Sequence, residues 1–302
     1  MANLKLIKSK ILSYKKTGTV THAMEAVSAV KMRKGQERAL SGRSYAASAL
    51  SVLERLSGTA DLSRHPMMQD RVGKTAVVVI TSDKGLAGGF NSGVIRAAEN
   101  LIQEKNLTKE DAIILAFGRK GGEFFKSRGF AVEVERTNVS DDISESELAE
   151  ITRMLIDRSD ITTVFVVYQN FISTFEQQPI SRQIVPIKPE VIREIVAGIR
   201  PARGRYAPQN DSEVVRPASY TVEPDAETVL SVLLPKLLNI AVFHALLESK
   251  ASEHSARMVA MKSATDKARD MAKSLTRIFN KVRQAAITRE VSEITSGMEA
   301  MK

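Results

Sequence analysis

The segment from Lys236 to Ser296 runs for sixty-one residues without a Gly or a Pro. As one continuous α-helix it would be roughly 92 Å long, at about 1.5 Å per residue. A compact domain of about 300 residues is only on the order of 45 Å across. A helix of this length has to extend beyond any globule that the chain forms, so we predict a shaft.

Apolar and small residues recur along this segment at steps of three and four. The series starts at Leu230 and runs to Ser263, and it continues from Leu275 to Ala285. Between residues 241 and 263 the series changes from Leu to Ala and Ser. Small side chains allow a second helix to approach closely, so this seam predicts a partner helix.

Residues 3–57 predict that partner helix. An apolar stripe begins at Leu4, is interrupted over residues 15–18, which we interpret as a weak point, and resumes at Val20. Each glycine inside an isolated helix costs about 1 kcal/mol relative to Ala, and this segment contains Gly18, Gly35 and Gly42. We therefore infer an antiparallel two-helix coiled coil made of both chain ends. The C-terminal helix is about twenty residues longer than the N-terminal helix that pairs with it. Its tip should therefore project alone.

The middle of the chain alternates between strand and helix patterns. β-branched apolar runs predict strands, and the intervening amphipathic stretches predict helices. The expected strands cover residues 75–82, 112–117, 131–135 and 162–168, with a possible edge strand at 183–187 limited by Pro186 and Pro189. The expected helices cover residues 91–105, 120–128 and 146–158, the last capped by Ser144 or Ser146. Alternation of this kind predicts a three-layer α/β domain with a mainly parallel sheet.

Three domains follow from these patterns. We expect an N-terminal coiled-coil helix at 1–57, an inserted α/β (Rossmann-like) domain at 58–225 with an irregular connection over 201–225, and a C-terminal coiled-coil helix at 226–302. The first segment carries 11 Lys and Arg against 3 Asp and Glu, and the last carries 12 against 8. The middle is slightly acidic. A partner of the terminal segments should therefore be acidic, and nucleic acid is one such partner.

The sequence contains no convincing catalytic, cofactor or metal site. Gly85–Gly89 follows a strand but matches neither the Walker nor the dinucleotide-binding pattern, so we interpret it as a structural strand-to-helix turn. His244 and His254 are too far apart on one helix to share a metal, and the chain has no Cys. Asp141-Asp142 and Glu145, Glu147 and Glu150 form an acidic cluster at a predicted helix start, which we interpret as a solvated face that complements the helix dipole. We expect no catalysis by the chain alone.

No targeting or membrane segment is expected either. The N-terminus lacks the apolar core of a signal peptide. We find no apolar run of eighteen residues anywhere in the sequence, which is the length needed to cross a membrane. We therefore expect that nothing in the chain spans a membrane.

One basic cluster stands out on the N-terminal helix. It consists of Lys31-Met32-Arg33-Lys34, followed by Arg38 and Arg43. On a helix these side chains point to more than one face, so a single neighbour cannot neutralise all of them. A solvated basic face is one interpretation, and contact with a surrounding acidic partner is the other.

Four separated motifs resemble the gamma-subunit family of the bacterial-type rotary ATP synthases, in the right order and over essentially the whole chain. They are Thr21-His22-Ala23-Met24-Glu25 with the basic cluster, Ser82–Asn91 (SDKGLAGGFN), Ala251–Lys262 (ASEHSARMVAMK) and Ile287–Gly297 (ITREVSEITSG). The resemblance implies a non-catalytic central-stalk rotor subunit. Its coiled coil stands inside a ring of alpha and beta subunits. Its lower part sits with the epsilon subunit on a membrane ring of c subunits, so that proton or sodium flow is coupled to ATP synthesis.

The resemblance also implies which residues contact partners and where the protein is found. Lys31, Arg33 and Lys34 would face an acidic loop of the beta subunits, beside Met24. The remaining implied contacts are Arg257, Arg283, Gln284, Thr288 and Glu290 toward the surrounding ring, and Tyr220 and Glu223 near the c-ring. No cofactor, metal or nucleic acid is implied. The expected place is the cytoplasmic face of a bacterial membrane, as a peripheral protein.

Two other functions stay open on the residues alone. The α/β domain could form a small-molecule enzyme that binds ATP or NAD. The basic helix could bind DNA with a steep salt dependence, although the middle domain is acidic and the helix lacks interleaved aromatic residues.

Overall fold

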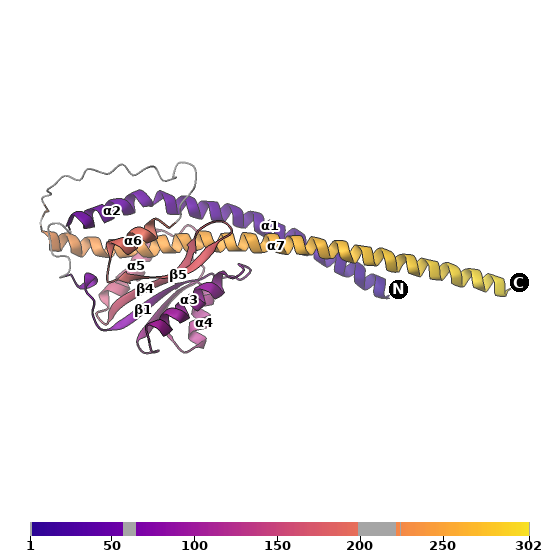
Figure 1. Cartoon of the computed structure of the whole chain (residues 1–302), viewed down its shortest axis with the longest axis horizontal. Helices are drawn as coiled ribbons and strands as arrows, with labels where there is room; N and C mark the ends of the chain where they lie inside the picture. Colours follow the sequence, from indigo (N-terminus) through magenta and orange to yellow (C-terminus); the bar gives the residue numbers. More distant parts are fainter. Residues whose placement is uncertain (1, 57–64, 199–221, 224, 302) are drawn as a thin grey trace. The chain divides into compact units, whose positions relative to one another are not determined.

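A computed structural model describes residues 2–56, 65–198, 222–223 and 225–301 (Figure 1). The N-terminal region forms α1 (Ala2–Ser41) and α2 (Arg43–Leu56), and the C-terminal region forms α7 (Ala226–Ala300). Between them lie a short 3-10 turn, η2 (Pro66–Met68), and nine further elements: β1 (Lys74–Ile80), α3 (Phe90–Glu104), β2 (Ala112–Phe117), α4 (Arg119–Ser127), β3 (Ala131–Arg136), α5 (Glu145–Asp157), β4 (Ile161–Phe171), β5 (Gln177–Val185) and α6 (Pro189–Val196).

Contacts divide the chain into two compact units. The first contains Met1–Ser28 and Met258–Lys302, and the second contains Ala29–Arg257. Both α1 and α7 therefore contribute residues to each unit. The domain boundaries expected at 57/58 and 225/226 differ from this division and stay a prediction.

The first unit is an antiparallel pair of helices. Gly18 of α1 faces Ala268 of α7, and a Cβ at Gly18 would lie 3.7 Å from the Ala268 Cβ. Three residues further along α1, the hydroxyl of Thr21 lies 2.7 Å from the hydroxyl of Thr265, which is three residues back along α7. The close approach predicted from the small residues is confirmed, because helices pack this tightly only where side chains are small.

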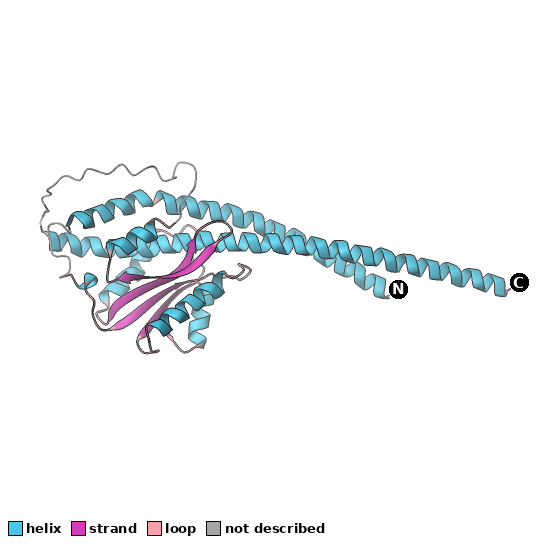
Figure 2. Cartoon of the chain, in the orientation of Figure 1, coloured by secondary structure: helices cyan, strands magenta, loops and turns pink. Residues whose placement is uncertain are grey.

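The second unit is built around one sheet, drawn in magenta in Figure 2. Its strand order is β3-β2-β1-β4-β5. Neighbouring strands run parallel except β4 and β5, which pair antiparallel at one edge. Helices α3 and α4 cover one face, and α2, α5, α6 and α7 pack on the other (Figure 1). The three-layer α/β fold with a mainly parallel sheet is confirmed, and α7 itself supplies part of the outer layer.

The larger core joins this sheet to the long helix. Leu234 and Leu237 of α7 are fully buried among β-strand side chains such as Val78 and Val166. Their burial contributes roughly 1.5–3 kcal/mol each. The sheet therefore shares its core with α7, in which a similar seam of small residues continues. Gly35 of α1, for example, lies against Ala251.

One expectation about the helices was wrong. The N-terminal segment is not a single helix, because α1 ends at Ser41 and α2 begins at Arg43, with Gly42 between them. The weak point expected over residues 15–18 lies inside α1, which is unbroken there. Helix α7 covers Ala226–Ala300 and includes Pro235, whose cost in a helix is outweighed by the packing around it.

The edge of the sheet also differs from expectation. The edge strand covers Gln177–Val185 and not 183–187. Pro189 begins helix α6 at its first turn, where its missing N–H is not needed. We had interpreted it only as a limit of the strand.

The prediction that the chain has no apolar segment of eighteen residues was also wrong. Helix α7 contains an eighteen-residue window that is long and apolar enough to cross a membrane. That window is 61% buried inside the fold, as expected for a helix that belongs to a protein core. By length and composition it is one candidate span among the described residues and only weak evidence for a membrane segment.

Candidate functional site: the polar surfaces of the two long helices

The basic cluster lies on α1 within the second unit. Arg33 and Lys34 are exposed, and neither has an ion-pair partner among the described residues. Lys31 is different, because its Nζ lies 2.7 Å from Oδ2 of Asp141. Two of the three cations that we predicted to contact a partner are therefore open to one, and the third already has an internal partner.

Asp141 connects this cluster to α7. Its Oδ1 lies 2.9 Å from Nε2 of His254, and its Oδ2 accepts from Lys31. The hydrogen bond from His254 is the main cause that holds the pKa of Asp141 well below its usual range, and Lys31 adds to it against the opposing effect of burial. Our interpretation of Asp141 as a solvated helix-start residue was wrong. Ser144 is the residue that caps α5, with a capping box to Glu147.

Arg257 lies inside the second unit. It is 9% exposed, and its guanidinium donates to Oε1 of Glu253 at 2.7 Å and lies 3.4 Å from Nδ1 of His254. Contact of Arg257 with a surrounding partner stays a prediction. This internal role was not predictable from the sequence, because Glu253, His254 and Arg257 have the spacing of an ordinary polar turn on the surface of a helix.

Met24 lies on α1 in the first unit. Its side chain is half-buried, and its carbonyl accepts from the hydroxyl of Ser28 at 2.7 Å. The buried Ser28 and half-buried Thr21 flank it on the same helix. The proposed partner contact of Met24 is not tested by this geometry.

The end of α7 extends past the N-terminal end of α1 in sequence register. The Gly18–Ala268 and Thr21–Thr265 pairs place Gln284 opposite Ala2, the first residue of α1. Residues 285–300 therefore have no α1 residue opposite them. The expectation of an unpaired tip is confirmed on this register.

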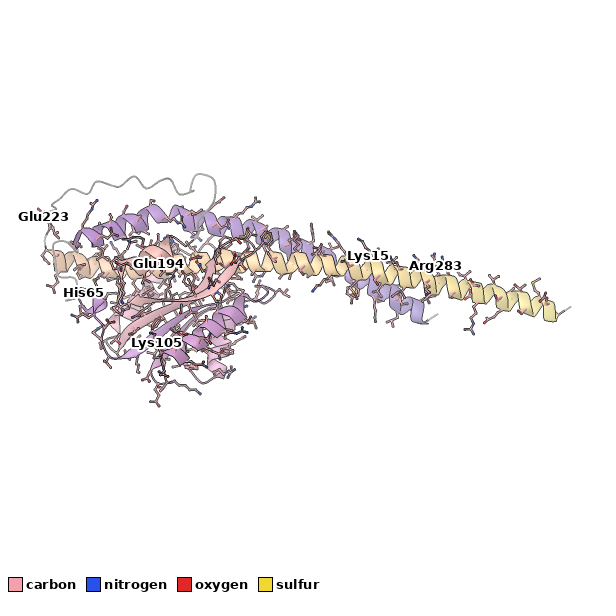
Figure 3. All side chains as sticks on the ribbon, in the orientation of Figure 1. Lys15, His65, Lys105, Glu194, Glu223 and Arg283 are labelled. Carbon is pink, nitrogen blue, oxygen red and sulfur yellow. The ribbon has the colours of Figure 1, made fainter. Side chains whose placement is uncertain are left out.

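The predicted contact residues near this end are all exposed: Arg283, Gln284, Thr288 and Glu290. Arg283 is labelled on α7 in Figure 3. The Thr288 hydroxyl donates to the Gln284 carbonyl at 3.0 Å, inside the helix. An exposed apolar stripe begins among them and continues toward the end of α7 at three- and four-residue steps: Ile287, Val291, Ile294 and Met298. Such a stripe on one helix face is typical of a surface that a partner covers.

Two of the predicted contact residues precede α7, and the structure describes only one of them. Glu223 is exposed just before the helix begins (Figure 3). Tyr220 lies outside the described residues. Their proposed contacts remain predictions.

The glycine-rich turn after β1 is held by its own side chains. Asp83 Oδ1 accepts from the backbone N–H of Arg119 at 3.0 Å, at the start of α4. Asn91 Oδ1 accepts from the backbone N–H of Ser82 at 2.9 Å. A carboxylate of the chain therefore occupies the anion-favouring end of α4. The turn itself leads into α3, whose N-terminus has no side-chain cap, so the structural interpretation of the turn stays a prediction.

The buried histidines serve packing and hydrogen bonding. His244 is 4% exposed and lies against Gly42, while His254 bonds to Asp141 as described above. Burial lowers the pKa of His244 to about 4, with a further contribution from Arg43. Among the described residues, no three His, Asp or Glu side chains are grouped to hold a metal ion.

Comparison with known proteins gives full-length matches. A profile described as ATP synthase matches residues 3–301. The "ATP synthase gamma chain" of Geotalea uraniireducens is 38% identical over 306 residues, and that of Geobacter sp. strain M21 is 40% identical over 306 residues. In both cases the match covers 100% of this chain and 100% of the relative.

Solved structures show the same fold. A chain of the Euglena gracilis mitochondrial ATP synthase, OSCP/F1/c-ring, aligns with a TM-score of 0.65 at 16% identity, covering 99% of this chain and 95% of that one. A chain of the Tetrahymena thermophila mitochondrial ATP synthase, central stalk and c-ring, aligns with a TM-score of 0.58 at 23% identity, covering 81% and 99%. Since the profile and relatives near 40% identity span the chain from end to end, this chain belongs to the ATP synthase gamma chain family.

Proposed function

We propose that this chain is the central-stalk rotor of an F-type ATP synthase, transmitting torque between a membrane c-ring and a catalytic hexamer of alpha and beta subunits. The observation that carries this proposal is the full-length similarity to ATP synthase gamma chains. As a member of that family the chain is a non-catalytic subunit of the complex. Ion flow would drive ATP synthesis through it, and ATP hydrolysis would drive ion pumping in reverse.

The basic cluster on α1 supplies the contact with the beta subunits. Arg33 and Lys34 are exposed cations, and an acidic loop on each beta subunit would meet them in turn. Exposed ion pairs contribute only about 0–1 kcal/mol. Such pairs form and release easily, which suits a contact that is remade at each step. Lys31 would join them only by giving up part of its pairing with Asp141.

The C-terminal part of α7 supplies the contact with the surrounding ring. Arg283, Gln284, Thr288 and Glu290 present polar groups, and Arg257 and Met24 are further proposed contacts. The exposed apolar stripe from Ile287 to Met298 fits a hydrophobic sleeve. In that sleeve the tip would turn as in a bearing, because apolar contacts are non-directional.

The other end of the molecule would face the membrane. Glu223, and Tyr220 outside the described residues, are proposed to lie near the c-ring, with the epsilon subunit beside them. We expect the complex at the cytoplasmic face of a bacterial membrane, with this chain as a peripheral component. No cofactor, metal or nucleic acid is part of the proposal.

Reconstitution tests this function. The purified chain is mixed with alpha and beta subunits of the same organism, and ATPase activity and rotation of single complexes are measured. We expect no ATPase activity from the chain alone, and unidirectional rotation from the mixture. Complexes that hydrolyse ATP at full rate without incorporating the chain would refute the proposal.

A further inference from the structure

One loop connects both long helices within the second unit. The loop between β3 and α5, residues 137–144, places the Asp141 carboxylate between Lys31 of α1, at 2.7 Å, and His254 of α7, at 2.9 Å. Ion pairs and hydrogen bonds to a charged group have a preferred geometry, unlike apolar contacts. A single side chain therefore fixes the positions of two helices relative to the loop.

Backbone carbonyls of the same loop add three more bonds. Arg38 of α1 donates to the carbonyls of Asp141 and Ile143, the latter at 2.7 Å. Lys250 of α7 donates to the carbonyl of Val139 at 3.0 Å. Among the described residues, every hydrogen bond from an α1 side chain to the α/β layers ends on this loop. From Leu4 to Ser41, where the burial of α1 is described, no residue belongs to the hydrophobic core that joins α7 to the sheet.

Arg257 supports the loop from a distance. A guanidinium can only donate hydrogen bonds, so Nδ1 of His254, 3.4 Å from Arg257, must accept. The imidazole proton is then on Nε2, which faces Asp141. Glu253 holds Arg257 in turn, with a 2.7 Å bond. The result is a chain of alternating donors and acceptors from α7 through the loop to α1.

We propose that loop 137–144 is a clasp that locks α1 and α7 to the α/β layers against twisting, with Asp141 as its positioning residue and Arg257 setting the His254 tautomer that Asp141 needs. The mechanical part of this inference rests on the proposed rotor function, because a subunit that carries torque must transmit force between its helices and its α/β layers. It assigns Arg257 an internal role. It also means that Lys31 belongs first to the clasp.

The clasp is tested first in the free full-length chain by hydrogen exchange of the Asp142 and Ile143 amides, which bond within the loop. Removing a hydrogen bond to a charged group changes an equilibrium by roughly tenfold or more. We expect Asp141→Asn to speed exchange of these amides by about that factor. Asp142→Asn is the matched control, measured at the Ile143 amide. The Asp142 carboxylate is 87% exposed, and its ion pair with Arg38, at 3.8 Å, contributes only about 0–1 kcal/mol, so this variant should change exchange much less than Asp141→Asn.

Two further variants separate the clasp from a general loss of stability. Lys31→Met alters an exposed side chain and should speed the same amides without changing exchange in the β1 strand. Arg257→Lys does not touch the loop, yet it should speed loop exchange and shift the nitrogen resonances of His254 away from the Nε2–H tautomer. Unchanged loop exchange in Asp141→Asn, or an unchanged His254 tautomer in Arg257→Lys, overturns the assignment.

The mechanical claim is tested in the reconstituted complex. Because the chain has no Cys, one Cys introduced at exposed Lys109 attaches a rotation probe to the α/β layers specifically. At fixed ATP, Asp141→Asn should roughly double the variance of the angular distribution within each dwell if the clasp is one of two attachments of equal stiffness, because the thermal variance is inversely proportional to stiffness. Asp142→Asn should not change it. Rotation of the parent complex with equal widths in both variants overturns the clasp. Absence of rotation in the parent itself overturns the rotor function and leaves the exchange results to decide the clasp.

Discussion

Replacing Glu248 with Gln should stabilise the chain above neutral pH. Glu248 lies on α7 with only 2% of its surface exposed. Its Oε1 accepts from the backbone N–H of Phe171 at 2.9 Å. Burial raises the pKa of this carboxyl from 4.5 to about 7, although the Phe171 N–H, Tyr168 and the cations Arg182 and Arg43 oppose the shift.

The magnitude follows from that difference in pKa. Each unit corresponds to about 1.4 kcal/mol, so a change from 4.5 to about 7 corresponds to about 3 kcal/mol of folding free energy. The folded state holds the proton more tightly than the unfolded state. The stability associated with the protonated carboxyl is therefore complete below pH 4.5 and is lost as the pH rises through 7. Gln keeps the acceptor for the Phe171 N–H and never ionises.

Urea unfolding of the free chain at several pH values between 5 and 8.5 measures the effect. We expect the free energy of unfolding of Glu248→Gln to be close to that of the parent at pH 5 and higher by up to about 3 kcal/mol at pH 8.5. Glu290→Gln is the matched control on the same helix, because Glu290 is exposed, and it should change stability by less than about 0.5 kcal/mol. A difference between Glu248→Gln and the parent that does not vary with pH would refute the reasoning.

Three other changes test separate parts of the fold. Gly118 has φ 94°, and a Cβ there would lie 2.2 Å from the backbone carbonyl oxygen of Thr81. Gly118→Ala should therefore lower the melting temperature by the equivalent of about 1–3 kcal/mol. Gly85→Ala is the control and should not lower it, because Gly85 has open space around it. Burial lowers the pKa of His244 to about 4, so the contribution of this group to stability should fall by up to about 3 kcal/mol between pH 6.5 and pH 4. Urea titrations should therefore show the stability of His244→Gln rising relative to that of the parent by up to this amount over the same range. Thr265→Val removes the hydroxyl that lies 2.7 Å from the Thr21 hydroxyl and should lower the free energy of unfolding by about 1 kcal/mol. If a double-mutant cycle with Thr21→Val showed that the two stability losses are fully additive, it would contradict a direct bond between the hydroxyls.

The long helices were predictable because their signals are local and repeat. The absence of Gly and Pro after Pro235, the three- and four-residue steps and the small residues facing each other all lie in contiguous sequence. The strands of the sheet were predictable for the same reason. The break between α1 and α2 at Gly42 was not, because the close approach of His244 to Gly42 joins residues that are far apart in the sequence.

Some features of the candidate site could likewise be predicted from the sequence, and others could not. The excess of positive charge on α1 and the unpaired end of α7 are properties of the sequence itself, since composition and helix length fix them. The partner of Lys31 is more than one hundred residues away, at Asp141, and the burial of Arg257 depends on neighbours that only the folded chain brings together. By itself the sequence determined a paired, basic, two-helix shaft with an α/β insertion. Only the tertiary structure decided which of its charges face solvent and which are used within the chain, because a charge is paired by its neighbours in space and not by its neighbours in sequence.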